Sequence, residues 1–531
     1  MAIMAMDMRK NKLSKLILIS LLGSSSTFAG ELVFTPSLII DETYTDNVEL
    51  SLSDEISSLV SQTGVAIETS YTAKKINFNL STQSLFAAYS HDHELDDDFH
   101  TVASDITIEL WPKGLSLIGG INIDRRARNQ TRNALADIVS GDTIKIESYI
   151  GGLQYNISNS HMILSSYISY IDKQSEDNIG NREGYVTAFN SQNGQGNHNI
   201  FWDIESNYQE IKNNERSSRM YSGEIKLGLI TSFKFNPFLR YFDEENNGNI
   251  GGNQALESNS YGAGIRWLIT PRLALDISYN KPIGNTLDTH GDEQKEYISS
   301  SINWQPTERT QLSASISQRF YGDSYSFSFT HKNKRFTNSI SYVEDVQTLT
   351  RNNYIPFDVG SYWCPNQDRL LVSECYVVGD TNINFDNYEL ITIRDFTIEE
   401  DDQYSLNKTL SWNSTLALAR TTFTLNILGS TRENLSTIQQ DENARADFRI
   451  SRKVSSKSTI NLNLSYTDNT FQKDTEDERR DRYRQYQINF EKSLNSKLAL
   501  DFSLGLVNRD SNDTLFNYEE SRVTFKITKD F

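Results

Sequence analysis

The fold is decided by the stretch Leu498-Ala499-Leu500-Asp501-Phe502-Ser503-Leu504-Gly505-Leu506, in which large apolar side chains alternate with small or polar ones. Side chains of a β-strand point to opposite faces in turn, so this strand has one apolar and one polar face. From Leu32 to Phe531 the chain repeats this pattern in runs of about ten residues separated by polar turns, and helical periodicity is almost absent. The sequence therefore predicts an all-β, antiparallel chain.

The apolar faces of these strands need a common partner. A soluble sandwich would bury them in a core, but 531 residues without an obvious linker far exceed the roughly 250 residues of a large single domain. No run beyond the first 29 residues approaches the roughly 18 apolar residues of a transmembrane helix. A mean hydropathy of -0.53 suits a barrel that hides its lipid-facing residues at every second position. We expect a transmembrane β-barrel of the bacterial outer membrane, forming one domain over residues 30–531.

The connections between strands alternate between short and long, which is typical of barrels with short periplasmic turns and longer extracellular loops. Strands counted between them number about 24, to within roughly four. The longest loop, 347–402, is expected either to plug or gate the mouth or to form a surface excursion. Short connections are predicted at 72–75, 111–114, 156–160, 270–272, 305–309, 332–334, 452–457 and 492–497, and long ones at 91–98, 125–141, 243–257, 282–294, 347–402 and 468–482.

The first 29 residues have the features of a signal peptide. Basic residues precede the apolar run Leu16 to Leu22, and Thr27-Phe28-Ala29 places small residues at the positions that a signal peptidase requires. Cleavage is expected between Ala29 and Gly30. A retained anchor is the alternative, but this apolar run falls well short of the roughly 20 residues that span a bilayer.

The last strand resembles the signal that the outer-membrane assembly machinery recognises. Phe525, Ile527 and the terminal Phe531 alternate with polar residues. Lys529 departs from the usual apolar residue at its position, and its long stem can reach the periplasmic headgroups. We therefore expect that machinery as a partner, with outer-membrane lipid and lipopolysaccharide around the barrel.

Charge and cysteine content narrow the possible partners. The formal net charge is -19, and it falls to -22 when the signal peptide removes four basic residues and Asp7, so nucleic acid is not expected to bind. The acidic residues are expected in solvated loops and the lumen, or bridged by divalent cations at the surface. Cys364 and Cys375 form an even pair in an exported chain and are expected to form a disulfide.

The sequence contains few candidates for catalysis or metal binding. His91-Asp92-His93, followed by four further acidic residues up to Asp98, could bind a metal if the loop folded back, but such loops are more often only solvated. No nucleophile elbow, paired Cys-x-x-Cys motif or phosphate-binding loop occurs. We expect no metal, no cofactor and no enzymatic activity.

Alternation also predicts which residues face the lumen and which lie at the membrane interfaces. Glu224 and Asp276 alternate with apolar neighbours, so they should face the lumen and give the pore a weak cation preference. Tryptophans cluster near strand ends, which favours aromatic girdles over ordinary cross-strand pairing. These tryptophans are Trp111, Trp202, Trp267, Trp304 and Trp412.

Two blocks of sequence resemble a known family. Phe34-Thr35-Pro36-Ser37-Leu38 leads into Glu42-Thr43-Tyr44-Thr45-Asp46-Asn47-Val48, and residues 319–335 read RFYGDSYSFSFTHKNKR, followed by SISYVEDV at 339–346. They resemble the outer-membrane barrels found in exopolysaccharide loci with the PEP-CTERM and exosortase sorting system, of the broad β-barrel porin type. By its own residues, the second block is a tight hairpin turning at Tyr321-Gly322-Asp323, with Phe327 and Phe329 facing lipid.

The resemblance implies an outer-membrane component of polysaccharide production or export, working as a channel or scaffold with polysaccharide and export partners. It supplies no catalytic residues. Two other functions remain open from the sequence, namely a general or substrate-specific uptake porin and a structural barrel that presents acidic loops at the cell surface.

Overall fold

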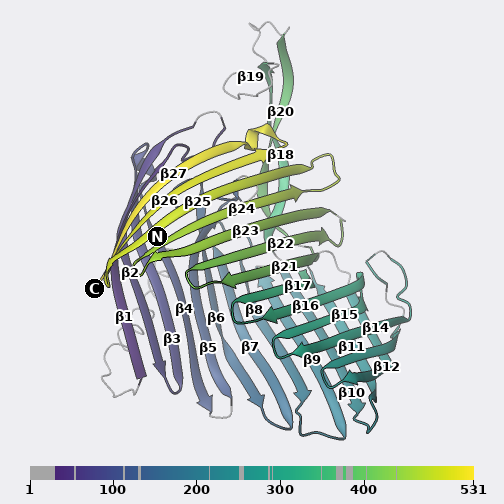
Figure 1. The fold of residues 1–531 in the computed structure, drawn as a ribbon. Coiled ribbons are helices and arrows are strands. Elements are labelled where there is room, and N and C mark those ends of the chain that lie inside the picture. The colour runs from purple at the N-terminus through teal and green to yellow at the C-terminus, as the bar shows by residue number, and fades with distance from the viewer. Residues whose placement is uncertain are drawn as a thin grey trace, which may run out of the picture.

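The computed structural model describes residues 30–52, 55–111, 114–129, 133–213, 216–249, 256–284, 287–289, 291–348, 350–365, 375–377, 387–401, 403–437 and 439–531. The expected signal peptide, including Ala29, lies outside them. The sheet has 24 antiparallel strands and closes on itself, because β1 pairs with both β2 and β27 (Figure 1). The predicted fold class and strand number are therefore confirmed. Within the described residues, no helix is long and apolar enough to cross a bilayer.

Twelve strands run away from the rim that carries the chain ends, which we call the inner rim. They are β1 (Gly30–Thr45), β3 (Ile76–Tyr89), β5 (Leu115–Ala127), β7 (Met162–Ser175), β9 (Ile200–Asn213), β11 (Phe235–Gly248), β13 (Leu273–Pro282), β15 (Thr310–Arg319), β17 (Phe336–Gln347), β22 (Thr421–Asn434), β24 (Ser458–Phe471) and β26 (Leu498–Ser511).

The other twelve return from the opposite, outer rim. They are β2 (Ser58–Ala73), β4 (Asp97–Trp111), β6 (Thr143–Ser158), β8 (Arg182–Asn193), β10 (Arg216–Leu229), β12 (Leu256–Thr270), β14 (Tyr297–Thr307), β16 (Gly322–Lys332), β21 (Ser405–Ala417), β23 (Gln440–Ser455), β25 (Arg479–Asn495) and β27 (Tyr518–Asp530). Two short 3-10 turns, η1 (His93–Leu95) and η4 (Thr514–Phe516), lie at the outer rim.

The connections predicted to be short all lie at the inner rim, and those predicted to be long all lie at the outer rim. Several outer loops are nevertheless shorter than expected. In the segment predicted as loop 243–257, Asp243 pairs with Asn259 and Glu245 with Glu257. Strands span 10 to 17 residues, whereas about 9 to 11 cross a bilayer, so neighbouring strands continue to pair beyond the outer membrane interface.

The outer surface of the barrel carries the apolar residues of each strand. Phe502, Leu504 and Leu506 are 40%, 43% and 55% exposed, and Ser503 lies on the opposite, lumen face. Trp111, Trp267 and Trp304 are exposed at inner strand ends, and exposed tyrosines such as Tyr170 and Tyr279 lie toward the outer ends. Aromatic residues therefore border the apolar band at both ends, although Trp412 lies near the middle of β21 and exposed Tyr155 near the inner end of β6.

The hairpin between β15 and β16 turns at the outer rim. Arg319 pairs with Gly322, so Phe320 and Tyr321 form the turn itself. Gly322 has a φ of 105°, a conformation that side chains with a Cβ rarely adopt, which explains glycine here. Phe327 and Phe329 lie on the same strand face as Tyr325, which is 44% exposed on the outer surface.

The walls of the barrel enclose a flattened lumen. In Figure 1, β1 to β9 form the far wall and β13 to β17 with β21 to β27 form the near wall, while β10 to β12 join the two at one side. This narrow side brings together strands that are not neighbours in the sheet, which matters for the lumen described below.

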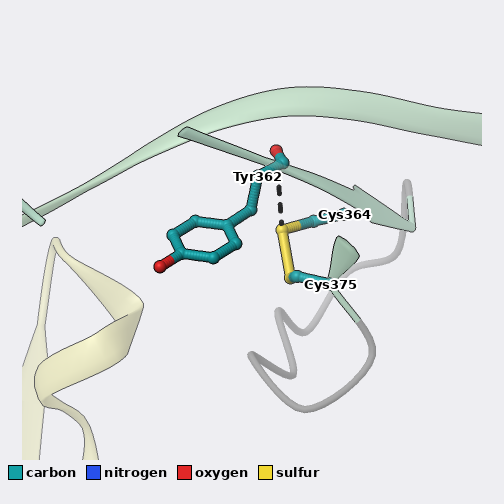
Figure 2. The surroundings of a disulfide bond; sticks show 3 residues. All are labelled: Tyr362, Cys364 and Cys375. Carbon is teal, nitrogen blue, oxygen red and sulfur yellow. Dashed lines mark hydrogen bonds between the residues drawn. A yellow bond between two sulfur atoms is a disulfide. The ribbon is translucent and has the colours of Figure 1, made fainter. Parts of the chain in front are cut away.

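The long loop between β17 and β21, expected either to plug or gate the mouth or to form a surface excursion, contains a separate β-hairpin. β18 (Thr350–Pro365) pairs with β20 (Tyr388–Asp401) and with the short β19 (Tyr376–Val377), and the hairpin rises beyond the outer rim (Figure 1). A disulfide joins Cys364 to Cys375 near its tip (Figure 2). Cys364 Sγ lies 4.0 Å from the carbonyl oxygen of Tyr362. This contact is not a hydrogen bond, because a disulfide sulfur carries no proton to donate.

Candidate functional site: the lumen and its outer mouth

The lumen has a packed sector along the narrow side of the barrel, on β9 to β15. Arg240 of β11 is 4% exposed, and it donates to Asn280 of β13 (3.1 Å), Tyr297 of β14 (3.0 Å) and Ser317 of β15 (3.4 Å). Arg319 of β15 donates to Glu244 of β11 at 2.8 Å. These bonds cross from strands up to four positions apart in the sheet, so side chains fill the lumen here.

Glu224 and Asp276 both lie in this packed sector, on the lumen face. Glu224 Oε1 accepts from Arg240 Nε at 2.5 Å, and Lys226 Nζ lies 3.5 Å from it. Asp276 accepts two hydrogen bonds of 2.8 Å from Arg266. A cation lies beside each carboxylate and offsets its charge. These two residues therefore do not give the pore the cation preference that the sequence suggested. Their role in the structure is to pair buried cations.

A second sector of the lumen is lined mainly by hydroxyl groups. Strands β14 to β17 and β21 present serine or threonine at most of their lumen positions, and hydroxyl pairs such as Ser315–Ser326 and Ser341–Ser411 lie 2.7 Å apart. On this face the charged residues Arg319, Lys332 and Asp345 stand at strand ends. We call this the hydroxyl sector; it comprises Ser299, Ser301, Ser313, Ser315, Ser317, Ser324, Ser326, Ser328, Thr330, Thr337, Ser339, Ser341, Thr409, Ser411 and Thr415.

The wall next to the hydroxyl sector, from β22 to β24, is charged and open to water. Arg445 of β23 makes two hydrogen bonds to Asp447, and both side chains remain substantially exposed in the lumen. Arg449 donates to Asn463 of β24 at 2.6 Å. The charged side chains of this wall are therefore accessible to solvent, unlike those of the packed sector.

A groove of about 720 Å³ runs along the lumen face of β1 to β8. Two adjacent cross-strand rows line it, and their members pair from strand to strand. One row contains Thr35, Glu68, Ser81, Ala103, Asn122, Ser148, Lys173 and Arg182, and the other contains Val33, Ser70, Asn79, Asp105, Gly120, Ile150 and Ile171. We call this feature the oblique groove.

The oblique groove climbs from the inner to the outer rim. Thr35 and Glu68 lie near the inner ends of β1 and β2, whereas Lys173 and Arg182 lie at the outer ends of β7 and β8. Strands of such barrels tilt by about 35–45°, so a row perpendicular to the strands rises along the wall. Seven interstrand steps of about 4.8 Å give a path on the order of 30 Å.

The outer mouth is narrowed by the loop between β5 and β6, whose described residues 128–129 and 133–142 reach across to β27. Asp137 accepts from Arg522 at 2.5 Å, and Ser140 donates to Glu520 at 2.6 Å. Tyr483 and Tyr518 form a buried cluster with Leu50, against which Ala134 and Leu135 of this loop pack. The loop is therefore fixed to the outer ends of β25 and β27 by both charge and apolar contact.

The hairpin of β18 and β20 meets the same loop from the other side of the barrel. A cavity of about 860 Å³ lies between them, lined by Phe357 and Ile398 of the hairpin and by residues of the β5–β6 and β7–β8 loops. At its edge, Arg128 Nε donates to Asp142 at 2.5 Å, which raises the pKa of the Arg128 guanidinium and keeps the pair charged. Two segments thus cover the mouth together.

Sequence reasoning missed a buried charged cluster at the outer rim of β25 and β26. Asp481, fully buried, lies 3.1 Å from Arg479 and 2.8 Å from Arg509. The ring of Phe516 in η4 lies 4.2 Å from the Arg479 guanidinium and 5.1 Å from that of Arg509. Period-two alternation assigns all three charges to the lumen face, but only the register between β25 and β26 reveals that they meet.

The histidine cluster is dispersed by its local structure. His91 Nδ1 lies 2.9 Å from Ser58 Oγ, and His93 Nδ1 lies 3.3 Å from Asp96, the residue that follows η1. Across the part of the chain that the structure describes, no group of three or more histidine, cysteine, aspartate or glutamate side chains is placed to hold a metal ion.

The residues of the expected assembly signal lie at the end of β27. Phe525 is 44% exposed on the outer surface, and the register places Ile527 and Lys529 on the same face. Phe531 follows the strand, is 64% exposed, and its backbone N–H donates to the carbonyl oxygen of Pro36 at 3.0 Å. The chain end is thus tied to β1 beside the barrel closure.

Neither a family profile nor a curated protein sequence matches this chain. Solved structures that resemble it include the siderophore receptor PirA from Acinetobacter baumannii (9% identity, TM-score 0.40, covering 94% of this chain and 80% of that one). The ferric enterobactin receptor PfeA from Pseudomonas aeruginosa and the FrpB iron transporter from Neisseria meningitidis are also 9% identical, with TM-scores of 0.42 and 0.40, and each match covers 94% of this chain and 81% of the other. These chains share a large β-barrel with this protein, and similarity at this level says nothing about its ligand.

Proposed function

We propose that this protein is an outer-membrane passage for exopolysaccharide, acting in its production or export as a channel or scaffold. The observation that carries the proposal is the hydroxyl sector, a stretch of the lumen wall on which serine and threonine side chains predominate. Hydroxyls both donate and accept hydrogen bonds, so they can replace water around a sugar chain at many successive positions. A wall of this kind binds each sugar weakly, which suits movement better than retention.

The surroundings of the barrel follow from its outer surface. An apolar band bordered by aromatic residues fits the lipid and lipopolysaccharide of the outer membrane, and the terminal strand of Phe525 to Phe531 fits recognition by the assembly machinery. Localisation in the outer membrane is part of the proposal. The proposal also includes export partners on the periplasmic side and membership of the family of exopolysaccharide-locus barrels.

A substrate-specific uptake channel is the second candidate function. The cavity of about 860 Å³ beneath the hairpin favours it, because this cavity lies at the outer rim, where a solute from outside would arrive first. A structural barrel without transport would need neither this cavity nor an open lumen.

A gene deletion separates the three functions. Loss of surface polysaccharide, with normal growth on simple nutrients, is the expected result and supports export. Normal polysaccharide with lost uptake of one defined solute would replace export by uptake. If both remain normal while surface adhesion or envelope integrity falls, the structural barrel is the correct function.

A further inference from the structure

We infer that the oblique groove is a binding track for an extended oligosaccharide, and that acidic groups on that chain bind preferentially at its outer end. The inference rests on the proposed function and adds a path and a charge class to it. The groove is distinct from the hydroxyl sector, which lies on the other wall of the flattened barrel (Figure 1).

The middle of the groove offers mostly neutral hydrogen-bonding groups, with the carboxylate of Asp105 among them, over a floor of small residues. Asn122 and Ser148 sit in one row, Asn79 and Ser70 in the other, and Ala103 and Gly120 leave space between them. Amides and hydroxyls can donate and accept, so they match sugar hydroxyls whatever the orientation of each sugar. Ile150, 44% exposed, adds apolar surface for the carbon face of a ring.

The two ends of the groove differ in charge. Glu68 is exposed toward the inner end, and Asp105 is exposed halfway along the groove, on β4, where it accepts one hydrogen bond from Asn79 at 3.0 Å. Lys173 and Arg182 pair in register at the outer end. Within the described residues, Arg182 Nε is buried without a hydrogen-bond acceptor, so it can bind an oxygen atom supplied by a ligand.

This charge difference makes the groove directional. An acidic group on a bound chain is repelled by Glu68 and Asp105 and attracted by Lys173 and Arg182, over a path of on the order of 30 Å. Its free energy therefore falls as it moves from the inner rim to the outer rim. That direction is the one that export requires.

The test measures how long oligosaccharides block single-channel current through the purified, folded protein in planar bilayers. Two probes of equal length are used, a neutral dextran oligosaccharide and an oligo-uronate. We expect Ser81→Trp, which fills the groove, to shorten the block by both probes about tenfold. Ser503→Trp is the matched control, because it adds the same side chain to a lumen-facing position that lies outside both the groove and the hydroxyl sector.

A double variant tests whether the groove prefers acidic chains, without adding a bulky side chain. Arg182→Gln combined with Lys173→Gln should shorten the oligo-uronate block about tenfold and leave the dextran block within about twofold. These variants keep the inference testable if Ser81→Trp fails to assemble, which gel migration without heating would reveal.

The outcomes also separate this inference from the proposed function. If Ser81→Trp and Ser503→Trp shorten the block equally, or if the oligo-uronate block is unchanged by the loss of Lys173 and Arg182, the track is wrong, while the proposed passage of polysaccharide still stands. If neither probe enters the unmodified pore from either side, the proposed function itself fails.

Discussion

Arg240 holds the narrow side of the barrel together, because one buried guanidinium satisfies partners on β10, β13, β14 and β15. We predict that Arg240→Met costs about 3–5 kcal/mol of unfolding free energy, since Glu224 would lose its main cation and Asn280 a donor. Urea unfolding in lipid vesicles measures this cost. The control is Arg445→Met, which removes a lumen-exposed ion pair and should cost less than about 1 kcal/mol. If Arg240→Met and Arg445→Met cost the same unfolding free energy, burial of the Arg240 network adds nothing to the stability of the barrel.

Leu504 tests the assignment of the two strand faces. It is 43% exposed on the outer surface between Phe502 and Leu506, whereas its neighbour Ser503 faces the lumen. Leu504→Arg should destabilise the barrel by about 2–4 kcal/mol if the site lies at mid-bilayer, because a guanidinium would enter hydrocarbon. Ser503→Arg places the same side chain in water and should be tolerated. The same unfolding assay applies, and a costly Ser503→Arg with a harmless Leu504→Arg would reverse the faces.

The disulfide belongs to the hairpin element and not to the barrel. Cys364 and Cys375 are 11 residues apart, and neither lies in a barrel strand. Replacing both by serine should speed proteolysis within the hairpin while the barrel unfolds within about 0.5 kcal/mol of the unmodified protein. Intact mass with and without reductant checks that the bond forms in the exported protein. A large loss of barrel stability would mean that the hairpin braces the wall.

At the scale of elements, the sequence was most informative where lipid imposes a strict pattern. Alternation of the kind seen at 498–506 predicts the strands, their number and the rim of each connection, because lipid accepts only apolar side chains at every second position. Beyond the interface this constraint ends. The outer halves of β11 and β12 and the hairpin of β18 and β20 are polar or mixed in sequence, so they were predicted as loops.

The lumen was harder to predict for a geometric reason. Alternation places Glu224 and Asp276 on the lumen face, but whether they meet water or a guanidinium depends on how sharply the sheet bends at β10 to β12. That bend brings Arg319 to Glu244 across four strands. Contacts between strands that are not neighbours require the closed shape of the barrel, and no local sequence pattern encodes them.

The whole molecule combines an open lumen with a covered mouth. The β5–β6 loop is fixed to β27 by Asp137 and Arg522, and the hairpin meets this loop over the cavity. Replacing residues 349–402 by a short glycine-serine linker should therefore raise single-channel conductance several-fold, with the barrel still resistant to detergent without heating. Shortening the β13–β14 loop, residues 283–296, is the control and should change conductance little. If conductance is unchanged when the hairpin is removed, the hairpin does not obstruct the mouth, and the β5–β6 loop alone covers it.

Ion selectivity depends on which carboxylates remain unpaired along the passage, not on the net charge of -19. Fixed charges attract counter-ions within about 8 Å at physiological salt, so a carboxylate bonded to a guanidinium adds little to the potential of the passage. Glu68→Gln with Asp105→Asn should therefore lower cation preference, measured as the reversal potential across a salt gradient, because both side chains are exposed in the groove. Glu224→Gln with Asp276→Asn should destabilise the packed sector and leave the reversal potential nearly unchanged, since Arg240 and Arg266 already offset these carboxylates. If Glu224→Gln with Asp276→Asn instead lowers cation preference more than Glu68→Gln with Asp105→Asn does, the ions pass along the narrow side of the barrel.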